Sequence, residues 1–234
     1  MGKDFSIHLD ATVDAVPEQI WDAIATGPGI SSWYLGRTEI DGDTVHTTFG
    51  DIPMPPATVT ARQPTDRFAH RTDTTADGRF LATEYLIEGR HRAATVLRTV
   101  TSGFLPGEDW ADEYEAMRFG TELFFATLVE YLRYFPGRPA TPVTVFGPPV
   151  TDWPATWASL HKTLGLSPDP RPGDRTTDGG QIYFTNPQTL GIRTPQGLYR
   201  YIRGFHGTLV AAHQIVTGDT HPERWATLLR TLKP

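Results

Sequence analysis

The pattern of apolar and polar residues is most regular between residues 108 and 135. Apolar side chains recur there at steps of three, four and seven residues, which is the period of one face of an α-helix. They are Trp110, Tyr114, Met117, Phe124, Leu128, Tyr131 and Phe135. Prolines and glycines bracket the segment at 106–107 and 136–137. The pattern predicts one continuous helix, roughly 40 Å long at about 1.5 Å per residue, that needs a large apolar partner surface.

Gly120 falls in the middle of this predicted helix, where a glycine costs about 1 kcal/mol relative to alanine. Two explanations are open for it. The more ordinary one is close packing of the helix against a sheet, and the alternative is that the missing side chain leaves room for a ligand.

The residues before this helix alternate with the period of a strand and are broken by turns. Residues 5–13 alternate strictly between apolar and polar, which predicts a half-buried strand. Pro17 suits the first turn of a helix over 17–25, and Gly27-Pro28-Gly29 is expected to end it, before a short turn or helix at 32–35. Further strands are predicted at 38–40, 45–49, 57–61, 67–71, 80–88 and 93–101, with a proline-rich loop at 53–56 near a sheet edge.

Several of these segments together resemble the START-like helix-grip superfamily. They are Pro17-Glu18-Gln19-Ile20-Trp21-Asp22-Ala23-Ile24, Trp33-Tyr34, Thr95-Val96-Leu97 leading to Ser102-Gly103-Phe104, and Trp110-Ala111-Asp112-Glu113-Tyr114. Within the superfamily they are most similar to the group named for homology to the activator of Hsp90 ATPase. The resemblance covers about residues 5–135. It implies a curved antiparallel sheet of six or seven strands, two short helices and the long helix around a deep apolar pocket.

Members of that superfamily bind lipids, polyketides, hormones or other small apolar ligands, and some are cyclases, dehydratases or chaperone partners. A shared fold does not determine what its pocket does. The resemblance therefore implies a pocket and leaves its use open.

The chain beyond residue 136 is predicted to form a smaller unit. A proline- and glycine-rich connector spans 136–149 and contains one strand at 143–146; a helix follows with Trp153, Trp157, Leu160 and Leu164 on one face. Strands at 181–185, 191–193, 198–203 and 208–216 precede a last helix that Pro222 opens. We predict an α+β protein with a helix-grip domain at 1–136 and a degenerate second helix-grip copy at 137–234. A unit with so few strands must pair with the first domain or with a second chain in a homodimer.

Composition and charge limit the classes of partner that this protein is expected to have. The 234 residues contain no cysteine, which excludes disulfides and thiolate chemistry, and carry a net charge of −6. Residues 1–135 hold 11 basic and 21 acidic side chains, whereas residues 136–234 hold 10 and 6. The acidic first part argues against nucleic acid, and the basic second part could dock on it. The chain has no run of 18 apolar residues, so we expect no membrane span and a cytoplasmic location.

The sequence contains no catalytic, phosphate-binding or dinucleotide-binding motif. We therefore assign no catalytic residue, no metal ligand and no cofactor, and we favour a binding protein over an enzyme. His46, His70 and His91 are scattered, His206 and His213 lie on opposite faces if their segment is a strand, and the acidic residues 108–115 are explained by the helix dipole. Tyr199-Arg200-Tyr201 with Arg203 mixes aromatic and basic groups, but a solvated strand face explains them best.

The remaining signal is aromatic. Seven residues fall on segments that border the cavity in helix-grip proteins, and we predict that they bind a small apolar or amphipathic ligand. They are Trp33, Tyr34, Phe49, Tyr85, Trp110, Tyr114 and Met117. The alternative is that these side chains fill the interior. Two other functions stay open: a cyclase- or dehydratase-like enzyme using the same pocket, and an interaction module for a chaperone or regulator.

Overall fold

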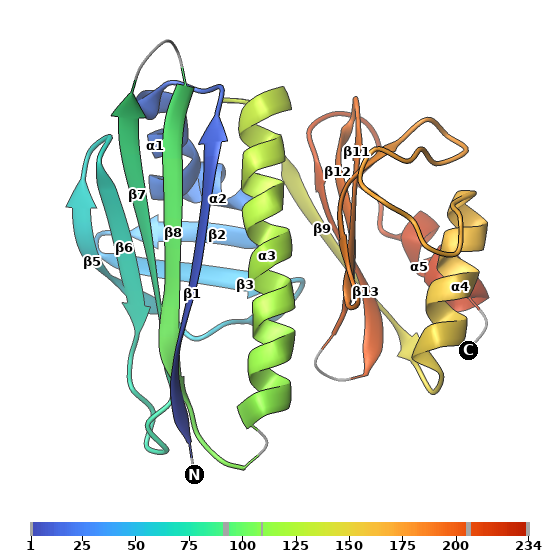
Figure 1. Cartoon of the computed structure of the whole chain (residues 1–234), viewed down its shortest axis with the longest axis horizontal. Helices are drawn as coiled ribbons and strands as arrows, with labels where there is room; N and C mark the ends of the chain where they lie inside the picture. The colour runs from blue at the N-terminus through green and yellow to red at the C-terminus, as the bar shows by residue number, and fades with distance from the viewer. Residues whose placement is uncertain (1, 91–93, 109, 205–206, 233–234) are drawn as a thin grey trace.

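A computed structural model describes residues 2–90, 94–108, 110–204 and 207–232. Two antiparallel sheets lie on either side of one long helix (Figure 1). The first part comprises β1 (Lys3–Val13), α1 (Pro17–Ala25), α2 (Gly27–Ser31), β2 (Arg37–Asp41), β3 (Thr44–Phe49), β4 (Ile52–Pro53), β5 (Ala57–Gln63), β6 (Arg67–Thr72), β7 (Phe80–Arg90), β8 (Ala94–Leu105) and α3 (Trp110–Tyr134). The second comprises β9 (Thr141–Pro149), α4 (Trp153–Leu164), β10 (Gln181–Asn186), β11 (Thr189–Thr194), β12 (Gly197–Arg203), β13 (Thr208–Ile215) and α5 (Glu223–Thr231).

The predicted fold class is confirmed. The first sheet has the strand order β1-β8-β7-β6-β5-β3-β2, with β4 paired to β3, so it has eight strands where the resemblance implied six or seven. It curves around α3, which is continuous over 25 residues as its apolar period predicts. Asp109, expected in the first turn of this helix, lies outside the described residues. The architecture is therefore an α+β helix grip.

The second sheet has the order β10-β11-β12-β13-β9. Its first strand in the chain, β9, pairs with its last, β13, just as β1 pairs with β8 in the first sheet. The second part thus follows the connection order of the first with fewer strands. The change from one sheet to the other falls between Tyr134 and Thr141. The division into domains at 1–136 and 137–234 stays a prediction.

The structure corrects two details of the elements predicted from the sequence. Gly27-Pro28-Gly29 does not only end α1; it begins a second helix, α2, because the Thr26 side chain accepts a hydrogen bond from the Gly29 N–H at 3.0 Å. In addition, residues 141–149 are not a connector that holds a short strand. They form β9, a full strand paired along β13.

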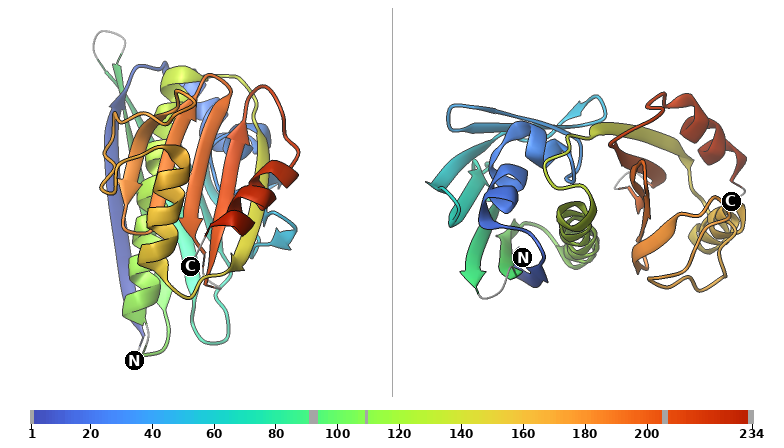
Figure 2. Two further views of the ribbon diagram at one scale, coloured as in Figure 1. Left: turned by 90° about the vertical axis from the view of Figure 1, so that its right-hand side faces the viewer. Right: turned by 90° about the horizontal axis from the view of Figure 1, so that it is seen from above.

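The second sheet packs its inner face on α3, opposite the first sheet (Figure 2). Polar contacts fix this interface. Arg193 donates to Glu130 of α3 at 2.7 Å, and Tyr183 shares a hydrogen bond with Thr127 of α3 at 2.8 Å. The Asn186 amide donates to the Phe119 carbonyl at 3.1 Å. The unit with few strands therefore pairs with the first domain, one of the two outcomes that the sequence left open.

The outer face of the second sheet is covered by α4 and α5 (Figure 1). Leu160 of α4 and Trp225 and Leu229 of α5 are almost wholly buried against Ile182, Leu190 and Tyr201 of the sheet. Asp152 caps α4 through a hydrogen bond from the Ala155 N–H, and Gly165 ends it in the left-handed conformation. None of the described helices is long and apolar enough to cross a membrane.

Candidate functional site

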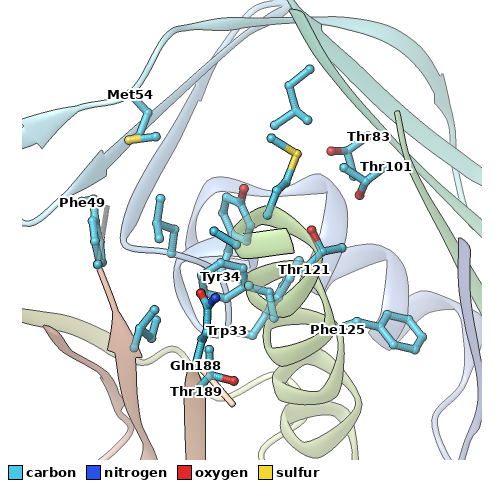
Figure 3. A pocket seen from close by; sticks show the side chains of 18 of the residues that line it. Trp33, Tyr34, Phe49, Met54, Thr83, Thr101, Thr121, Phe125, Gln188 and Thr189 are labelled. Atoms are coloured by element: carbon cyan, nitrogen blue, oxygen red, sulfur yellow. The ribbon is translucent and has the colours of Figure 1, made fainter. Parts of the chain in front are cut away.

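A cavity of about 380 Å³ lies between the first sheet, α3 and one end of the second sheet (Figure 3). It extends from Ala116 to Leu128 along α3, which is roughly 18 Å of helix. The first sheet and its connections supply Trp33, Tyr34, Leu35, Phe49, Ile52, Met54, Leu81, Thr83, Tyr85, Thr99 and Thr101; the second part supplies Phe146, Gln188, Thr189, Ile202, Arg203, Gly204 and Thr208. The site is thus built by both parts of the chain.

Small hydroxyl side chains on two neighbouring strands leave the space open. Thr83 of β7 pairs with Thr101 of β8, and Tyr85 pairs with Thr99, so all four point to the same face of the sheet. Thr83 and Thr101 lie side by side across the cavity from Phe49 and Met54 (Figure 3). Among the described residues, the three threonine hydroxyls have no hydrogen-bond partner. They therefore offer donors and acceptors to whatever occupies the cavity.

The α3 side of the cavity is shaped by Gly120. A Cβ atom built there would meet only one atom within 4 Å, Cε2 of Phe124 at 3.9 Å. Close packing, the more ordinary explanation of this glycine, is therefore wrong. Gly120 instead lines the cavity beside Ala116, Met117 and Thr121. Its missing side chain leaves open space, as the alternative explanation predicts.

The third wall is the segment after α2, which the second sheet holds in place. The Trp33 indole donates to the Ala23 carbonyl at 2.9 Å. Arg200 of β12, which is fully buried, donates to the carbonyls of Trp33 and Tyr34 at 2.6 and 2.7 Å and to that of Ala212 at 2.7 Å. Burial lowers the pKa of Arg200 to about 10, so it keeps its charge at neutral pH. The interpretation of Arg200 as part of a solvated strand face is wrong.

The interior of the cavity is uncharged. Burial raises the pKa of Tyr85 well above its ordinary value and raises that of Tyr34 as well. Both phenols therefore stay protonated and can donate a hydrogen bond, and among the described residues neither hydroxyl has a partner. Of the described residues that line the cavity, Arg203 alone is charged, and its guanidinium lies over the Trp153 ring of α4 at 4.8 Å.

The open end of the cavity lies where the two parts of the chain meet. Phe49 of β3 packs edge-on against Phe146 of β9, with ring centroids 5.3 Å apart. Ile52 and Phe146 are large apolar side chains that stay 46% and 41% exposed at this end. At the other end, Trp33, Tyr85 and Leu128 are buried.

Five of the seven aromatic and methionine residues expected at a ligand site come together around the cavity: Trp33, Tyr34, Phe49, Tyr85 and Met117. The other two lie outside its lining. The Trp110 ring lies under the Lys3 ammonium group at 4.6 Å, and Tyr114 packs edge-on against Phe5 at 5.8 Å. Both belong to the first turns of α3, below the level at which the helix meets the cavity. Ligand binding by any of the seven stays a prediction.

The threonines and Arg203 line the cavity but are not among the residues that the sequence predicts for it. Threonine is common in strands for reasons of conformation alone, so its position on β7 and β8 did not stand out. The pattern that could have identified the threonines is the alternation of the strands. Thr83 lies two residues from Tyr85, and Thr99 lies two residues from Thr101, so each pair faces the same side of the sheet. Arg203 was noticed only as part of a basic and aromatic segment.

The other groups considered for chemistry lie apart from the cavity. His46 is exposed. His213 is buried beside Trp225, with ring centroids 4.9 Å apart, and its Nδ1 accepts from the Arg200 backbone N–H at 3.0 Å. In the acidic segment, Glu113 pairs with Arg79. His91 and His206 lie outside the described residues. Within the described part of the chain, no group of three or more His, Asp or Glu side chains could hold a metal ion.

No family model and no curated protein matches this chain in sequence. In structure it is similar to the Aha1 dimer from Colwellia psychrerythraea, with 18% identity and a TM-score of 0.46 over 57% of this chain and 99% of that chain. Protein MLL2253 from Mesorhizobium loti has 19% identity and a TM-score of 0.46 over 55% of this chain and 96% of that one. DynU16, from the dynemicin biosynthetic locus, has 19% identity and a TM-score of 0.45 over 95% of this chain and 91% of that one. At these TM-scores the likenesses carry no functional conclusion.

Proposed function

We propose that this protein binds a small apolar or amphipathic molecule in the cavity between the first sheet and α3. One observation carries the proposal: a cavity of about 380 Å³ lies between the first sheet, α3 and one end of the second sheet, lined mainly by apolar side chains and by a few hydroxyls. Ligand pockets typically have volumes of about 300–1,000 Å³ and combine apolar walls with a small number of polar groups.

The polar groups support a ligand that is not a pure hydrocarbon. Thr83, Thr99, Thr101, Tyr34 and Tyr85 present hydroxyls at the cavity, and a buried hydroxyl without a partner is unfavourable. A carbonyl or hydroxyl group on the ligand would satisfy them. The proposed occupant is therefore a mainly apolar molecule with one or two neutral polar atoms in its body.

Isothermal titration calorimetry with dodecanol, a neutral apolar probe, tests the proposal. Ala116→Phe places a ring in the cavity, because Ala116 lines it on α3, and we expect this variant to lose dodecanol binding. Ala111→Phe is the matched control: it makes the same change on an exposed turn of the same helix, and binding should persist. Equal binding by both variants would show that dodecanol sits elsewhere, and no binding by the unmodified protein to dodecanol or to a panel of lipids and polyketides would defeat the proposal.

A second candidate function is catalysis in the same cavity, of the cyclase or dehydratase kind. It needs a polar group with a perturbed pKa at the cavity. The phenol of Tyr85 is such a group, because burial raises its pKa. A phenol that stays protonated can polarise a ligand carbonyl by donating a hydrogen bond. Tyr85→Phe keeps the ring and removes the donor. If the protein is an enzyme, Tyr85→Phe should still bind the ligand but no longer convert it. If the protein only binds the ligand, neither the unmodified protein nor the variant should convert it.

We also propose that the chain belongs to the START-like superfamily and functions in the cytoplasm without nucleic acid. The helix-grip architecture supports the first statement, and the acidic first part of the chain supports the exclusion of nucleic acid. A homodimer is a further proposal, which sedimentation equilibrium tests. Binding to a chaperone or regulator would use exposed apolar side chains such as Val16 or Tyr134.

A further inference from the structure

Residues 49–56 of the first part border the open end of the cavity, and we call them the flap. The flap comprises the last residue of β3, a turn, β4 and the prolines that follow it. Three of its side chains, Phe49, Ile52 and Met54, line the cavity, and Ile52 remains 46% exposed. The flap is therefore part of the cavity wall and part of its rim.

Within the first sheet the flap is attached only to β3. β4 pairs with the end of β3 and with no other strand among those that the structure describes. The Met54 N–H donates to the carbonyl of Thr47, which also belongs to β3, at 2.9 Å. Pro53, Pro55 and Pro56 have no backbone N–H to donate. The flap can therefore move without breaking the pairing of the other strands.

The opposite side of the open end is β9 of the second part, and only packing joins it to the flap. The Phe49 and Phe146 rings meet edge-on, with centroids 5.3 Å apart. A Cβ atom built on Gly50 would lie 3.5 Å from the Thr144 Cβ, so the turn of the flap lies directly against β9. In the part of the chain that the structure describes, no hydrogen bond or ion pair joins the flap to β9.

β9 itself is fixed on both sides of this contact. It pairs along β13 in the second sheet. The Ala140 N–H, just before β9, donates to the buried Ser32 hydroxyl at 2.9 Å, and Arg200 ties the same sheet to the carbonyls of Trp33 and Tyr34. Of the two sides of the open end, the flap is the one that is free to move.

We propose that the flap is the gate of the cavity: it separates from β9 to let a ligand enter or leave, and it closes against Phe146 once the ligand is bound. This inference rests on the function proposed above and adds the route of access. The cavity is otherwise walled by the paired strands β7 and β8 and by the continuous helix α3. Opening those walls would break backbone hydrogen bonds, whereas opening the flap separates only apolar side chains from β9.

A disulfide between the flap and β9 tests the proposal. The sequence contains no cysteine, so Gly50→Cys/Thr144→Cys can form only one disulfide within the chain. The Cβ separation of 3.5 Å is within the usual range of about 3.5–4.5 Å. The reduced form of this variant is the reference, because the left-handed backbone at Gly50, with φ of 61°, suits cysteine less well than glycine.

Stopped-flow fluorescence with N-phenyl-1-naphthylamine, a neutral apolar probe, measures the rates of association and release. Oxidation of the double variant should slow both rates by roughly tenfold or more, because the gate can no longer open, and reduction should restore them. The Kd should change little, since both rates fall together. Gly50→Cys and Thr144→Cys as single variants, treated with the same oxidant, should keep their rates.

Phe146→Ala tests the gate without a disulfide. It removes the ring against which the flap closes, so association and release should both become faster, by about threefold. Loss of a ligand contact alone would speed release only. Tyr134→Ala is the matched control, because Tyr134 is an aromatic side chain of similar exposure outside the cavity lining, and its rates should not change.

The outcomes separate the gate from the binding function. If the probe binds and associates equally fast with the oxidised and reduced double variant, with the disulfide verified by mass spectrometry, the gate is overturned and the binding function stands. Association with Phe146→Ala no faster than with Tyr134→Ala would overturn the gate too, and this comparison decides if the disulfide does not form. If the unmodified protein binds neither N-phenyl-1-naphthylamine nor dodecanol, the proposed function itself fails.

Discussion

The strands of the two sheets are connected in the same order, but the cores that the sheets enclose are packed differently. In each, the first strand pairs with the last and the remaining strands follow as a meander. The first sheet curves around a helix of 25 residues and leaves a cavity, whereas the second is covered by the shorter helices α4 and α5 over a core of large side chains. A cavity is therefore a property of the side chains that face the interior, not of the strand order.

Particular residues make the difference. The inner face of the first sheet carries Thr83 and Thr101 opposite Gly120 of α3. The second sheet carries Leu190 and Ile192 on the strand next to its edge, and these meet Leu160 or Trp225 from the covering helices. Branched apolar and aromatic side chains fill a volume that hydroxyls and a glycine leave open. This comparison leads to four stability predictions.

The largest effect is expected from truncating a leucine in the filled core. Leu160→Ala should lower the free energy of unfolding by about 2–5 kcal/mol, because Leu160 is fully buried and its loss opens a new cavity. Leu81→Ala, the same change at a residue that already borders empty space, should lower it by less than half as much. Urea unfolding measures both, and equal losses would contradict an open cavity in the first part.

The next effect concerns the contact between the parts. Arg200→Met should lower the free energy of unfolding by about 3 kcal/mol, because it removes the guanidinium donors to the carbonyls of Trp33 and Ala212 in a buried site. Arg62→Met removes an exposed arginine that also donates to a backbone carbonyl, that of Gly42. Its effect should stay within about 0.5 kcal/mol. A loss at Arg200 no larger than at Arg62 would mean that the second sheet does not hold the cavity wall.

A pH effect should come from His70, which faces the interior of the first sheet beside Phe68 and Tyr85. Burial lowers its pKa to about 4, against about 6.5 for an unfolded histidine. Between these values the unfolded state binds more protons, so the free energy of unfolding should fall as the pH falls from about 6.5 to about 4, by at most about 3 kcal/mol. In His70→Gln the fall should be shallower, while His46→Gln, an exposed control, should follow the unmodified protein.

The smallest effect has the opposite sign. Gly120→Ala should raise the free energy of unfolding by about 1 kcal/mol, because alanine favours the helix and its Cβ would meet only Phe124 Cε2, at 3.9 Å. Gly29→Ala is the contrasting control, since a Cβ there would lie 1.9 Å from the Asp22 carbonyl oxygen, and it should be destabilising. A loss of stability at Gly120 would point back to close packing.

Local patterns predicted most of the elements. The apolar period of residues 110–134 predicted α3 as one helix, and strict alternation predicted β1, because burial on one side imposes each period directly. The N-cap of Thr26 was overlooked because the glycines and proline beside it usually end a helix. Residues 141–149 were interpreted as a connector because prolines are common in linkers and at sheet edges alike.

The site was less predictable, because its key contacts join residues far apart in the chain. The aromatic residues around the cavity followed from the resemblance and the helix period. No local signal shows that Arg200 is buried, since its three acceptors lie 12, 166 and 167 residues away. Trp110 and Tyr114 share the apolar face of α3, but the helix extends beyond the cavity, and periodicity alone does not tell where along a helix a cavity begins.

A crystal structure under xenon pressure tests the central claim most directly, because dry apolar cavities take up xenon. The account predicts a xenon atom between Gly120 of α3 and Thr101 of β8, and none in the core around Leu160 and Trp225. The account would be contradicted if side chains of the first sheet and α3 filled this space and no xenon bound beside Gly120.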